Sequence, residues 1–403
     1  MNSIMFLHEF TSQRLHLYYQ QQKESGVKSL MNGLRRLFKF APFMAVFLFL
    51  AGCGERRLTA LDPMGPQSQW IYDNMILSLY VMAIVIIVVF VLFFIVVARF
   101  RHKEGDNEYP EQVHGSTKLE VAWTVIPLFL LAILAVPTVT GQFYLSNTGL
   151  EAQEAENEEE VDEEELDAES AEELGDDVMK ITATGHQFWW QFDYDFGDDS
   201  FTAGNEVYVP VDTKVAFVLE AEDVMHSFWV PALAGKVDNI PGIENYMWLE
   251  ASEPGVYKGK CAELCGPSHA LMDFRLIALE QDEFDEWATA MQEEEEAPTE
   301  SLANEGRELF EEQSCLQCHA VDGDGGAMGP SLANFGDRET IANYLEVTDE
   351  NLKAWIQDPQ SLKQGNNMPA YPDLSDEELD ALVAYLNQLE KLDPETKEGL
   401  ERD

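Results

Sequence analysis

Two long apolar runs dominate the hydropathy pattern of this 403-residue chain. Residues 75–98 and 121–144 are each twenty-four residues without a charge. As helices rising 1.5 Å per residue, each would cover roughly 36 Å, more than the ~30 Å hydrocarbon core of a bilayer. The connection between them begins with three basic residues: Arg99, Arg101 and Lys103. Because basic residues favour the cytoplasmic side, the pattern predicts a transmembrane hairpin within 53–148, with a cytoplasmic connection and everything after Tyr144 exported.

A shorter apolar run lies nearer the N-terminus. The basic stretch RRLFK leads into thirteen uncharged residues, 40–52, which end in LAG before Cys53. This run is too short to be a third membrane helix, whereas a basic region, a short apolar run and small residues before a cut site describe an export signal. The sequence LAGC also resembles a bacterial lipoprotein signal. We therefore expect 1–52 to be an extension with its signal, Cys53 to be lipidated, and the protein to lie in the bacterial cell membrane.

Between residues 178 and 290 the pattern changes to an alternation of period two. Segments such as VMKITATGHQFWWQFDYDF and EVYVPVDTKVAFVLEA alternate aromatic and β-branched residues with polar ones, and Gly, Pro and Asp bound them. This alternation is typical of strands with one buried face. The pattern predicts a small antiparallel sandwich or barrel of about a hundred residues.

The region 301–392 has a helical texture. SDEELDALVAYLNQL spaces its apolar residues as an amphipathic helix does, and Ser375 with Glu378 forms a capping box at its start. A short acidic and proline-containing segment, 291–300, precedes this all-α region as a linker. Residues 393–403 are expected to form a tail.

The charge composition adds a strong acidic excess. The chain has 74 acidic and 25 basic residues and a formal net charge of -49. This excludes nucleic acid as a partner, since little would neutralise its phosphates. Sixteen of the twenty-seven residues in 151–177 are Asp or Glu. Such a run repels itself and has almost nothing to bury, so 149–177 is predicted to be a solvated linker between the hairpin and the β region.

The first pair of cysteines suggests a metal site. Cys261 and Cys265 lie in KCAELCGPSHALMDF, and His226 in HSFWVP precedes them. A disulfide or a zinc knuckle would need neither Met272 nor the HSFWVP segment. Thiolate, imidazole and thioether together are a soft donor set that suits copper, and two thiolates can bridge a pair of copper ions. The candidate ligands are His226, Cys261, Glu263 through its carbonyl, Cys265, His269 and Met272.

The spacing C-x-E-x-C-x-x-x-H-x-x-M resembles the dinuclear copper (CuA) site of subunit II of cytochrome c oxidase. GHQFWWQF at 185–192 looks like the aromatic segment near that family's copper, and STKLEVAWTVIPL at 116–128 looks like the start of its second span. The resemblance covers roughly 65–285. It implies a cupredoxin-like Greek-key β-barrel with two copper ions, anchored by two helices beside a catalytic subunit I that contains haems and a further copper.

The resemblance also implies roles for two carboxylates. The Glu263 side chain would hold a magnesium ion shared with subunit I, and Glu120 would lie near a proton-uptake channel, although an ordinary interfacial charge explains Glu120 equally well. Two positions depart from the family. Phe188 stands where many members have the tryptophan that accepts electrons from soluble cytochrome c, which argues against the usual docking route. Ile243 stands where an arginine is common, which indicates altered contacts with subunit I.

The second pair of cysteines lies in SCLQCHA, which contains the haem c attachment motif C-x-x-C-H. Cys315 and Cys318 would form the two thioethers, with His319 as the proximal iron ligand. The bare motif could also bind zinc, but here it opens a helical domain that resembles cytochrome c. Met368, in GNNMPAYPDL, is the expected sixth ligand because methionine before proline in a late loop matches that family; Met328 is the alternative.

These features together predict subunit II of a haem–copper cytochrome c oxidase of the aerobic respiratory chain, with its own haem c. Electrons would enter at haem c, pass to dinuclear copper and continue to subunit I, which reduces oxygen to water. Trp189 and Trp190 are candidate bridging groups, though core packing explains them nearly as well. The expected partners are the membrane, subunits I and III, and an external donor such as a soluble cytochrome or an upstream respiratory complex.

Two other functions fit the sequence. One is the electron-input subunit of a nitric oxide reductase that uses similar copper, and the other is a membrane-anchored electron carrier without a catalytic partner. A quinol oxidase subunit is disfavoured because the complete metal ligand set is present.

Overall fold

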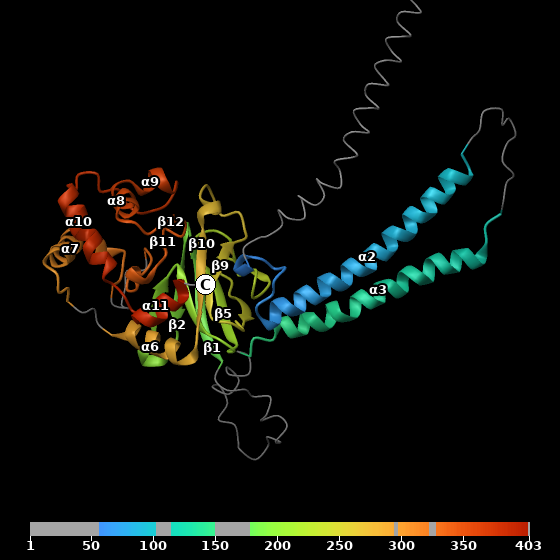
Figure 1. Cartoon of the computed structure of the whole chain (residues 1–403), viewed down its shortest axis with the longest axis horizontal. Coiled ribbons are helices and arrows are strands. Elements are labelled where there is room, and N and C mark those ends of the chain that lie inside the picture. The colour runs from blue at the N-terminus through green and yellow to red at the C-terminus, as the bar shows by residue number, and fades with distance from the viewer. Residues whose placement is uncertain (1–55, 102–113, 150–177, 294–296, 322–327, 402–403) are drawn as a thin grey trace, which may run out of the picture. The chain divides into compact units, whose positions relative to one another are not determined.

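The computed structural model describes residues 56–101, 114–149, 178–293, 297–321 and 328–401 (Figure 1). Cys53, the predicted signal and almost all of the acidic linker lie outside the described residues.

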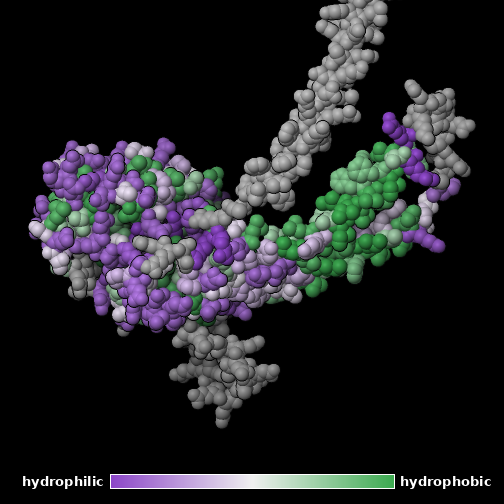
Figure 2. All heavy atoms as spheres, in the orientation of Figure 1, coloured by the Kyte–Doolittle hydropathy of each residue, from purple (hydrophilic) through white to green (hydrophobic). Residues whose placement is uncertain are grey.

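Two long helices contain the predicted membrane spans. Helix α2 covers Pro66–Arg99 and α3 covers Thr117–Ser146, and the two run side by side (Figure 1). Figure 2 shows hydrophobic side chains along most of this hairpin and hydrophilic ones at its far end. Both helices are long and apolar enough to cross a membrane. Helix α2 begins before the apolar run because its first turn is tied to the β region: Ser68 N donates to Leu233 O at 3.1 Å, and Gln67 Nε2 donates to Trp248 O at 2.6 Å.

The β region consists of two five-stranded sheets. The first has the strand order β3-β2-β1-β5-β8 and the second β4-β10-β9-β6-β7. The strands of the first sheet are β1 (Met179–His186), β2 (Trp189–Tyr194), β3 (Phe201–Gly204), β5 (Val215–Ala221) and β8 (Asn245–Leu249). Those of the second sheet are β4 (Glu206–Pro210), β6 (His226–Trp229), β7 (Lys236–Asn239), β9 (Gly255–Cys261) and β10 (Asp273–Leu279).

Two strand pairings differ from the antiparallel arrangement that the sequence predicts. β1 pairs in parallel with β5, with Ile181 opposite Phe217, and β10 pairs in parallel with β4, with Leu276 opposite Val207. Alternating hydrophobicity reports which face of a strand is buried but carries no information about the direction of its neighbour. The mixed sheets make the cupredoxin-like barrel that the family resemblance implies.

An aromatic cluster fills the barrel between the two sheets. Trp190 and Phe228 both pack on Phe274, with ring centroids 5.2 and 4.6 Å from it. All three rings are almost completely buried. Such aromatic pairs add about 0.5–1.5 kcal/mol each beyond the burial of their area. His226, a candidate metal ligand at the start of β6, lies beside this cluster, with its ring centroid 6.1 Å from that of Trp190.

Helices outside the strands extend and cover the barrel. Helix α6 (Gln281–Gln292) buries Trp287, whose ring stacks on Tyr208 with centroids 4.2 Å apart. Helix α11 (Pro394–Glu401) lies in the segment expected to be a tail. Its Thr396 Oγ1 donates to Glu283 Oε1 at 3.3 Å, and Leu400 packs against the barrel core. The polar sequence PETKEGLE does not predict these contacts, because their partners lie far away in the chain.

The C-terminal helices form a second core. They are α7 (Ser301–Glu312), α8 (Asp349–Gln357), α9 (Pro359–Leu362) and α10 (Asp376–Asn387), with a short β11–β12 pair (Thr340–Ile341, Leu345–Glu346). Helices α7 and α10 cross so closely at Gly306 that a Cβ there would lie 1.9 Å from Ala381 O. The capping box at the start of α10 is confirmed: Glu378 N donates to Ser375 Oγ at 3.3 Å, and Ser375 N donates to Glu378 Oε2 at 2.7 Å.

Candidate copper centre and haem pocket

Strand pairing brings the first donor group together. His226 begins β6 and Cys261 ends β9, and these strands pair with Phe228 opposite Cys261. Cys265 lies in the loop that follows β9. His269 begins a short 3-10 helix, His269–Leu271, and Met272 follows just before β10. Residues thirty-five positions apart therefore meet at one end of the second sheet.

The donor atoms of this cluster are close to one another. The two cysteine Sγ atoms are 3.9 Å apart, which is far too long for a disulfide. Cys261 Sγ lies 3.9 Å from His226 Nδ1 and 3.3 Å from Glu263 O. Cys265 Sγ lies 3.7 Å from both His269 Nδ1 and Met272 Sδ. All six sequence-predicted ligands are thus assembled around two thiols, in an arrangement that soft metal ions such as copper prefer.

Asp223 and Gln187, which the sequence did not single out, orient this cluster. His226 Nε2 donates to Asp223 Oδ1 at 2.9 Å, which leaves Nδ1 facing the thiols. Burial alone would raise the pKa of Asp223, but hydrogen bonds from His226 and from two backbone N–H groups bring it below its usual range. Gln187 Nε2 donates to Cys265 O at 2.5 Å. Asp223 lies in the segment DVMHSFWVP, so a carboxylate three residues before a candidate ligand was the available signal.

The thiol pair favours a negative charge. The hydrogen bond between the thiols lowers the pKa of Cys261 to about 3, against the opposing effect of burial, with His226 adding to the lowering. The same pairing raises the pKa of Cys265. The pair therefore holds one thiolate readily, and thiolate is the form that binds metal.

The two carboxylates singled out in the sequence lie outside the donor cluster. The Glu263 side chain folds back to accept a hydrogen bond from Leu264 N at 3.0 Å, so only its carbonyl faces the thiols. Glu120 lies exposed in the first turn of α3. Ile243 is half-exposed on the loop between β7 and β8.

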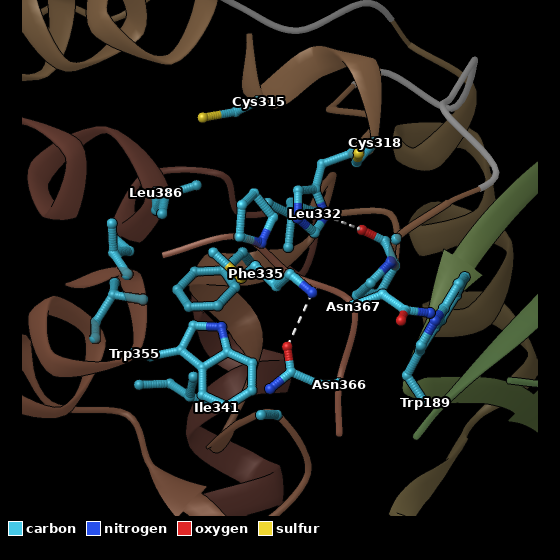
Figure 3. Close-up of a pocket in the computed structure, with 18 of the residues that line it drawn as sticks. Trp189, Cys315, Cys318, Leu332, Phe335, Ile341, Trp355, Asn366, Asn367 and Leu386 are labelled. Atoms are coloured by element: carbon cyan, nitrogen blue, oxygen red, sulfur yellow. Dashed lines mark hydrogen bonds between the residues drawn. The ribbon is translucent and has the colours of Figure 1, made fainter. Parts of the chain in front are cut away.

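A pocket lined mostly by the C-terminal domain, and partly by the β1–β2 turn of the barrel, contains the haem motif. Figure 3 shows Cys315 and Cys318 at one end of it and Trp355 and Asn366 at the other. A hydrogen bond joins the motif to the turn Gly329–Pro330: His319 Nδ1 donates to Pro330 O at 2.8 Å. This bond fixes the ring and leaves Nε2 free for iron. Burial lowers the pKa of His319, so the imidazole is held in the neutral form that ligates a metal.

Both candidate distal methionines line the pocket, but their settings differ. Met368 is half-buried, and its backbone N–H donates to Asn366 Oδ1 at 2.9 Å. Met328 is 68% exposed and follows directly after residues outside the described part of the chain. The geometry favours a fixed position for Met368. The apolar lining includes Leu332, Phe335, Ile341, Trp355 and Leu386, which suits a large flat hydrophobic cofactor (Figure 3).

The two tryptophans have different surroundings. Trp189 lines the haem pocket and stacks on His186, with ring centroids 4.1 Å apart and planes 5° apart. Trp190 is buried in the barrel core, its ring edge facing His226 at a centroid distance of 6.1 Å. Phe188, at the departure from the family pattern, is buried and lines the haem pocket as well. The β1–β2 turn therefore lies between the two sites.

Comparison with known families gives a match over most of the described chain. Residues 59–140 match the family "Cytochrome C oxidase subunit II, transmembrane domain" and residues 199–279 match its periplasmic domain. Residues 303–390 match the cytochrome c family. These matches include the helical hairpin, most of the barrel and the haem motif.

Full-length relatives agree with these matches. Cytochrome c oxidase subunit 2 of Alkalihalophilus pseudofirmus is 60% identical over 88% of this chain and 98% of the relative. The subunit 2 of Bacillus subtilis is 40% identical over 85% of this chain and 94% of the relative. A quinol oxidase subunit 2 from Bacillus subtilis is 31% identical, but over only 66% of this chain. The chain therefore belongs to the family of cytochrome c oxidase subunit II, the copper-binding membrane-anchored subunit of an oxidase complex, in a form that carries its own cytochrome c domain.

Proposed function

We propose that this subunit accepts electrons at its own haem c and passes them through dinuclear copper to the oxygen-reducing subunit I. The observation that carries the proposal is the shared β1–β2 turn. Gln187 in that turn hydrogen-bonds the Cys265 carbonyl at the copper cluster, while Phe188 and Trp189 line the haem pocket. Electron transfer between two redox groups requires a short distance between them. The β1–β2 turn contacts both the copper cluster and the haem pocket.

The copper ligands in this proposal are the assembled cluster. Cys261 and Cys265 would bridge two copper ions, His226 and His269 would each cap one ion, and Met272 and the Glu263 carbonyl would be weak outer ligands. When bound, the pair of ions would carry one electron at a time. The contribution of the chain is to hold the donors on strand ends and to orient His226 through Asp223.

The haem residues have equally distinct tasks. Cys315 and Cys318 would anchor haem c covalently, and His319 and Met368 would be its axial ligands. A His/Met pair raises the haem potential. The pocket is lined largely by apolar side chains, and Pro330 O holds the His319 ring. Trp189 is the proposed first group on the path to copper and Trp190 a second, because one lines the haem pocket and the other lies edge-on to His226.

Further assignments follow from the family. We propose the segment limits 1–52, 53–148, 149–177, 178–290, 291–300, 301–392 and 393–403 as the organisation of the chain. The protein would lie in the bacterial cell membrane, with lipid on Cys53 and its copper and haem domains on the extracytoplasmic side. Subunit III and an external electron donor would complete the complex. The Glu263 side chain would contribute to a magnesium site with subunit I, and Glu120 would act in proton entry.

The test is spectroscopic and uses the intact oxidase complex. We expect an EPR hyperfine pattern of one electron shared by two copper nuclei, together with a low-spin haem c whose optical spectrum indicates methionine ligation. Rapid reduction of haem c should then be followed by reduction of copper within the same molecule. A mononuclear copper signal, zinc in place of copper, or a haem that never reduces the copper would contradict the proposal.

A further inference from the structure

Lys363 is a buried lysine that belongs to neither the copper ligands nor the haem ligands. It is only 2% exposed, and burial lowers the pKa of its ammonium group to about 7, although Asp273 and Cys265 act in the opposite direction. Burying an ammonium group costs several kcal/mol unless hydrogen bonds compensate. A lysine in this position is therefore expected to have a specific set of partners.

The partners of Lys363 belong to two different domains. Its Nζ donates to Phe188 O in the barrel at 2.7 Å and to Ala342 O in the cytochrome c domain at 2.8 Å. Phe188, Ala342 and Lys363 all line the haem pocket. One side chain thus connects the wall of the haem pocket to the turn whose Gln187 bonds the Cys265 carbonyl.

The residues after Lys363 strengthen this contact. We name 363–365 the docking segment. Ser268, directly before the candidate ligand His269, donates from Oγ to Gln364 O at 2.7 Å. Gly365 lies so close to the copper loop that a Cβ there would be 3.1 Å from Pro267 Cγ. The docking segment therefore lies on the loop that carries the candidate copper ligands, and it ends three residues before Met368 in the haem pocket.

A second contact seats the opposite side of the haem pocket on the barrel. Pro330, whose carbonyl holds His319, packs against Gly204 at the end of β3, where an added Cβ would lie 2.6 Å from Pro330 Cβ. The loops on both faces of the haem pocket therefore touch the barrel. Of the two contacts, only the one at the docking segment reaches the copper loop.

We propose that Lys363 is a positioning residue that holds the cytochrome c domain against the copper loop and so sets the rate of electron transfer between haem c and copper. This inference rests on the proposed electron route and deepens it. With both groups bound, one electron would pass from the haem iron held by His319 and Met368 to the copper held by Cys261 and Cys265, so that iron would be oxidised as copper is reduced, with no proton required. Lys363 touches neither metal and acts through the carbonyls that it joins.

The test compares Lys363→Met with the wild-type complex. Methionine keeps the apolar stem and removes the donors. We expect the haem-to-copper rate to fall about tenfold or more as the docked arrangement becomes the minor state, because each loss of ~1.4 kcal/mol reduces its equilibrium constant tenfold. The copper EPR signal, the haem spectrum and both potentials should remain close to wild-type. Lys363→Arg, which keeps the donors, should restore most of the rate. The matched control is Lys353→Met, since Lys353 is a lysine of the same domain whose ion pair, with Asp380, lies within that domain.

A second readout does not depend on copper. In the copper-free full chain with haem attached, Lys363→Met should speed hydrogen exchange of the amides in 265–268 and 363–366, and Lys353→Met should not. If Lys363→Met fails to accumulate with haem, Ser268→Ala should show the same changes at smaller amplitude. A wild-type rate and wild-type exchange in Lys363→Met would overturn the inference. If the wild-type complex transfers no electron to copper, the proposed function fails, and the exchange result alone decides the role of Lys363.

Discussion

The copper cluster and the haem pocket solve the same problem, holding a redox metal, in opposite ways. In the barrel, donors from β6, from the end of β9 and from the loop after it lie 3.3–3.9 Å apart before any ion is considered. In the helical domain, Cys315, Cys318, His319 and Met368 stand around a pocket lined by apolar side chains. A small ion needs converging donors, whereas a large flat cofactor needs an apolar space with ligands on two sides.

The difference follows from the scaffolds. Paired strands fix their neighbours by ladder hydrogen bonds, so the end of a sheet can place several short side chains with little freedom. Helices joined by loops can enclose a larger volume because they touch one another only along narrow seams, such as the crossing at Gly306. Replacing a metal ligand at one site should therefore leave the cofactor of the other site bound, although the docking segment joins the two domains.

The sharpest test of that independence exchanges a cysteine at each site. Cys261→Ser should abolish the shared-electron copper signal, because a serine hydroxyl stays protonated where a thiolate is required. The covalent haem spectrum should be unchanged. Cys315→Ser should produce the reverse result, with copper retained and haem attachment impaired. EPR and optical spectra of both variants check this, and loss of both cofactors in either one would show that the sites fold as a single unit.

Replacing the distal ligand should have the next largest effect. Met368→Ala should lower the haem potential by on the order of 0.1 V or more, because axial ligands move haem potentials over a range of ~0.8 V. Met328→Ala is the matched control and should leave the potential unchanged, since that side chain is largely exposed. Redox titration of the haem distinguishes the two. A lower haem potential in Met328→Ala, with no change in Met368→Ala, would assign the sixth ligand to Met328.

The helix crossing should be the structural weak point of the haem domain. Gly306→Ala places a methyl group 1.9 Å from Ala381 O, and separating α7 from α10 to accommodate it should cost about 3 kcal/mol of unfolding free energy. The copper signal should survive under conditions where the haem domain unfolds. Denaturation followed separately by haem absorbance and by copper EPR measures this. Stability equal to wild-type would mean that the crossing relaxes freely.

A buried glutamate in the barrel should make stability depend on pH. Burial raises the pKa of Glu206 to about 7, with Arg338 and the hydrogen bond from Tyr208 partly opposing. Between its ordinary value and pH 7 the folded state keeps this proton while the unfolded state loses it, so stability falls as pH rises through that window. Glu206→Gln should remove up to about 3 kcal/mol of this dependence. Unfolding curves at pH 5 and pH 8 that shift equally in both proteins would contradict the assignment.

The smallest effect is expected at the cap of α10. Ser375→Ala removes the acceptor for Glu378 N and should destabilise the haem domain by about 1 kcal/mol. The copper centre should not respond. Thermal unfolding monitored by haem absorbance measures the change, and Thr at the same position should restore most of it. A copper signal that weakens with Ser375→Ala would imply tighter coupling between the two scaffolds than their packing indicates.

Much of the architecture was readable from local sequence. The hairpin follows from two charge-free runs, and the haem attachment motif and the Ser375 cap are contained in a few adjacent residues. The six candidate copper ligands also lie in two short segments, and the structure brings all of them together. These features are predictable because their chemistry depends on spacing along the chain.

Other features depend on partners that are distant in sequence. Gln187 hydrogen-bonds the Cys265 carbonyl, 78 positions away, only because the β1–β2 turn and the loop after β9 meet at the copper cluster. Asp223, by contrast, is a local partner of His226. The parallel pairing of β1 with β5 and the packing of α11 on the barrel have no local signature. Nothing in the sequence around Lys363 marks it as buried, yet its Nζ lies between carbonyls of two domains.

The types and spacing of the candidate ligands are local properties, so the sequence alone predicts a copper centre and a haem c. How the two sites meet, through the turn at 187–188 and the docking segment, depends on the folded arrangement of the two domains. The physical reason is that a hydrogen bond or a packed contact depends on distance in space, and residues 175 positions apart, such as Phe188 and Lys363, become neighbours only when both cores have folded.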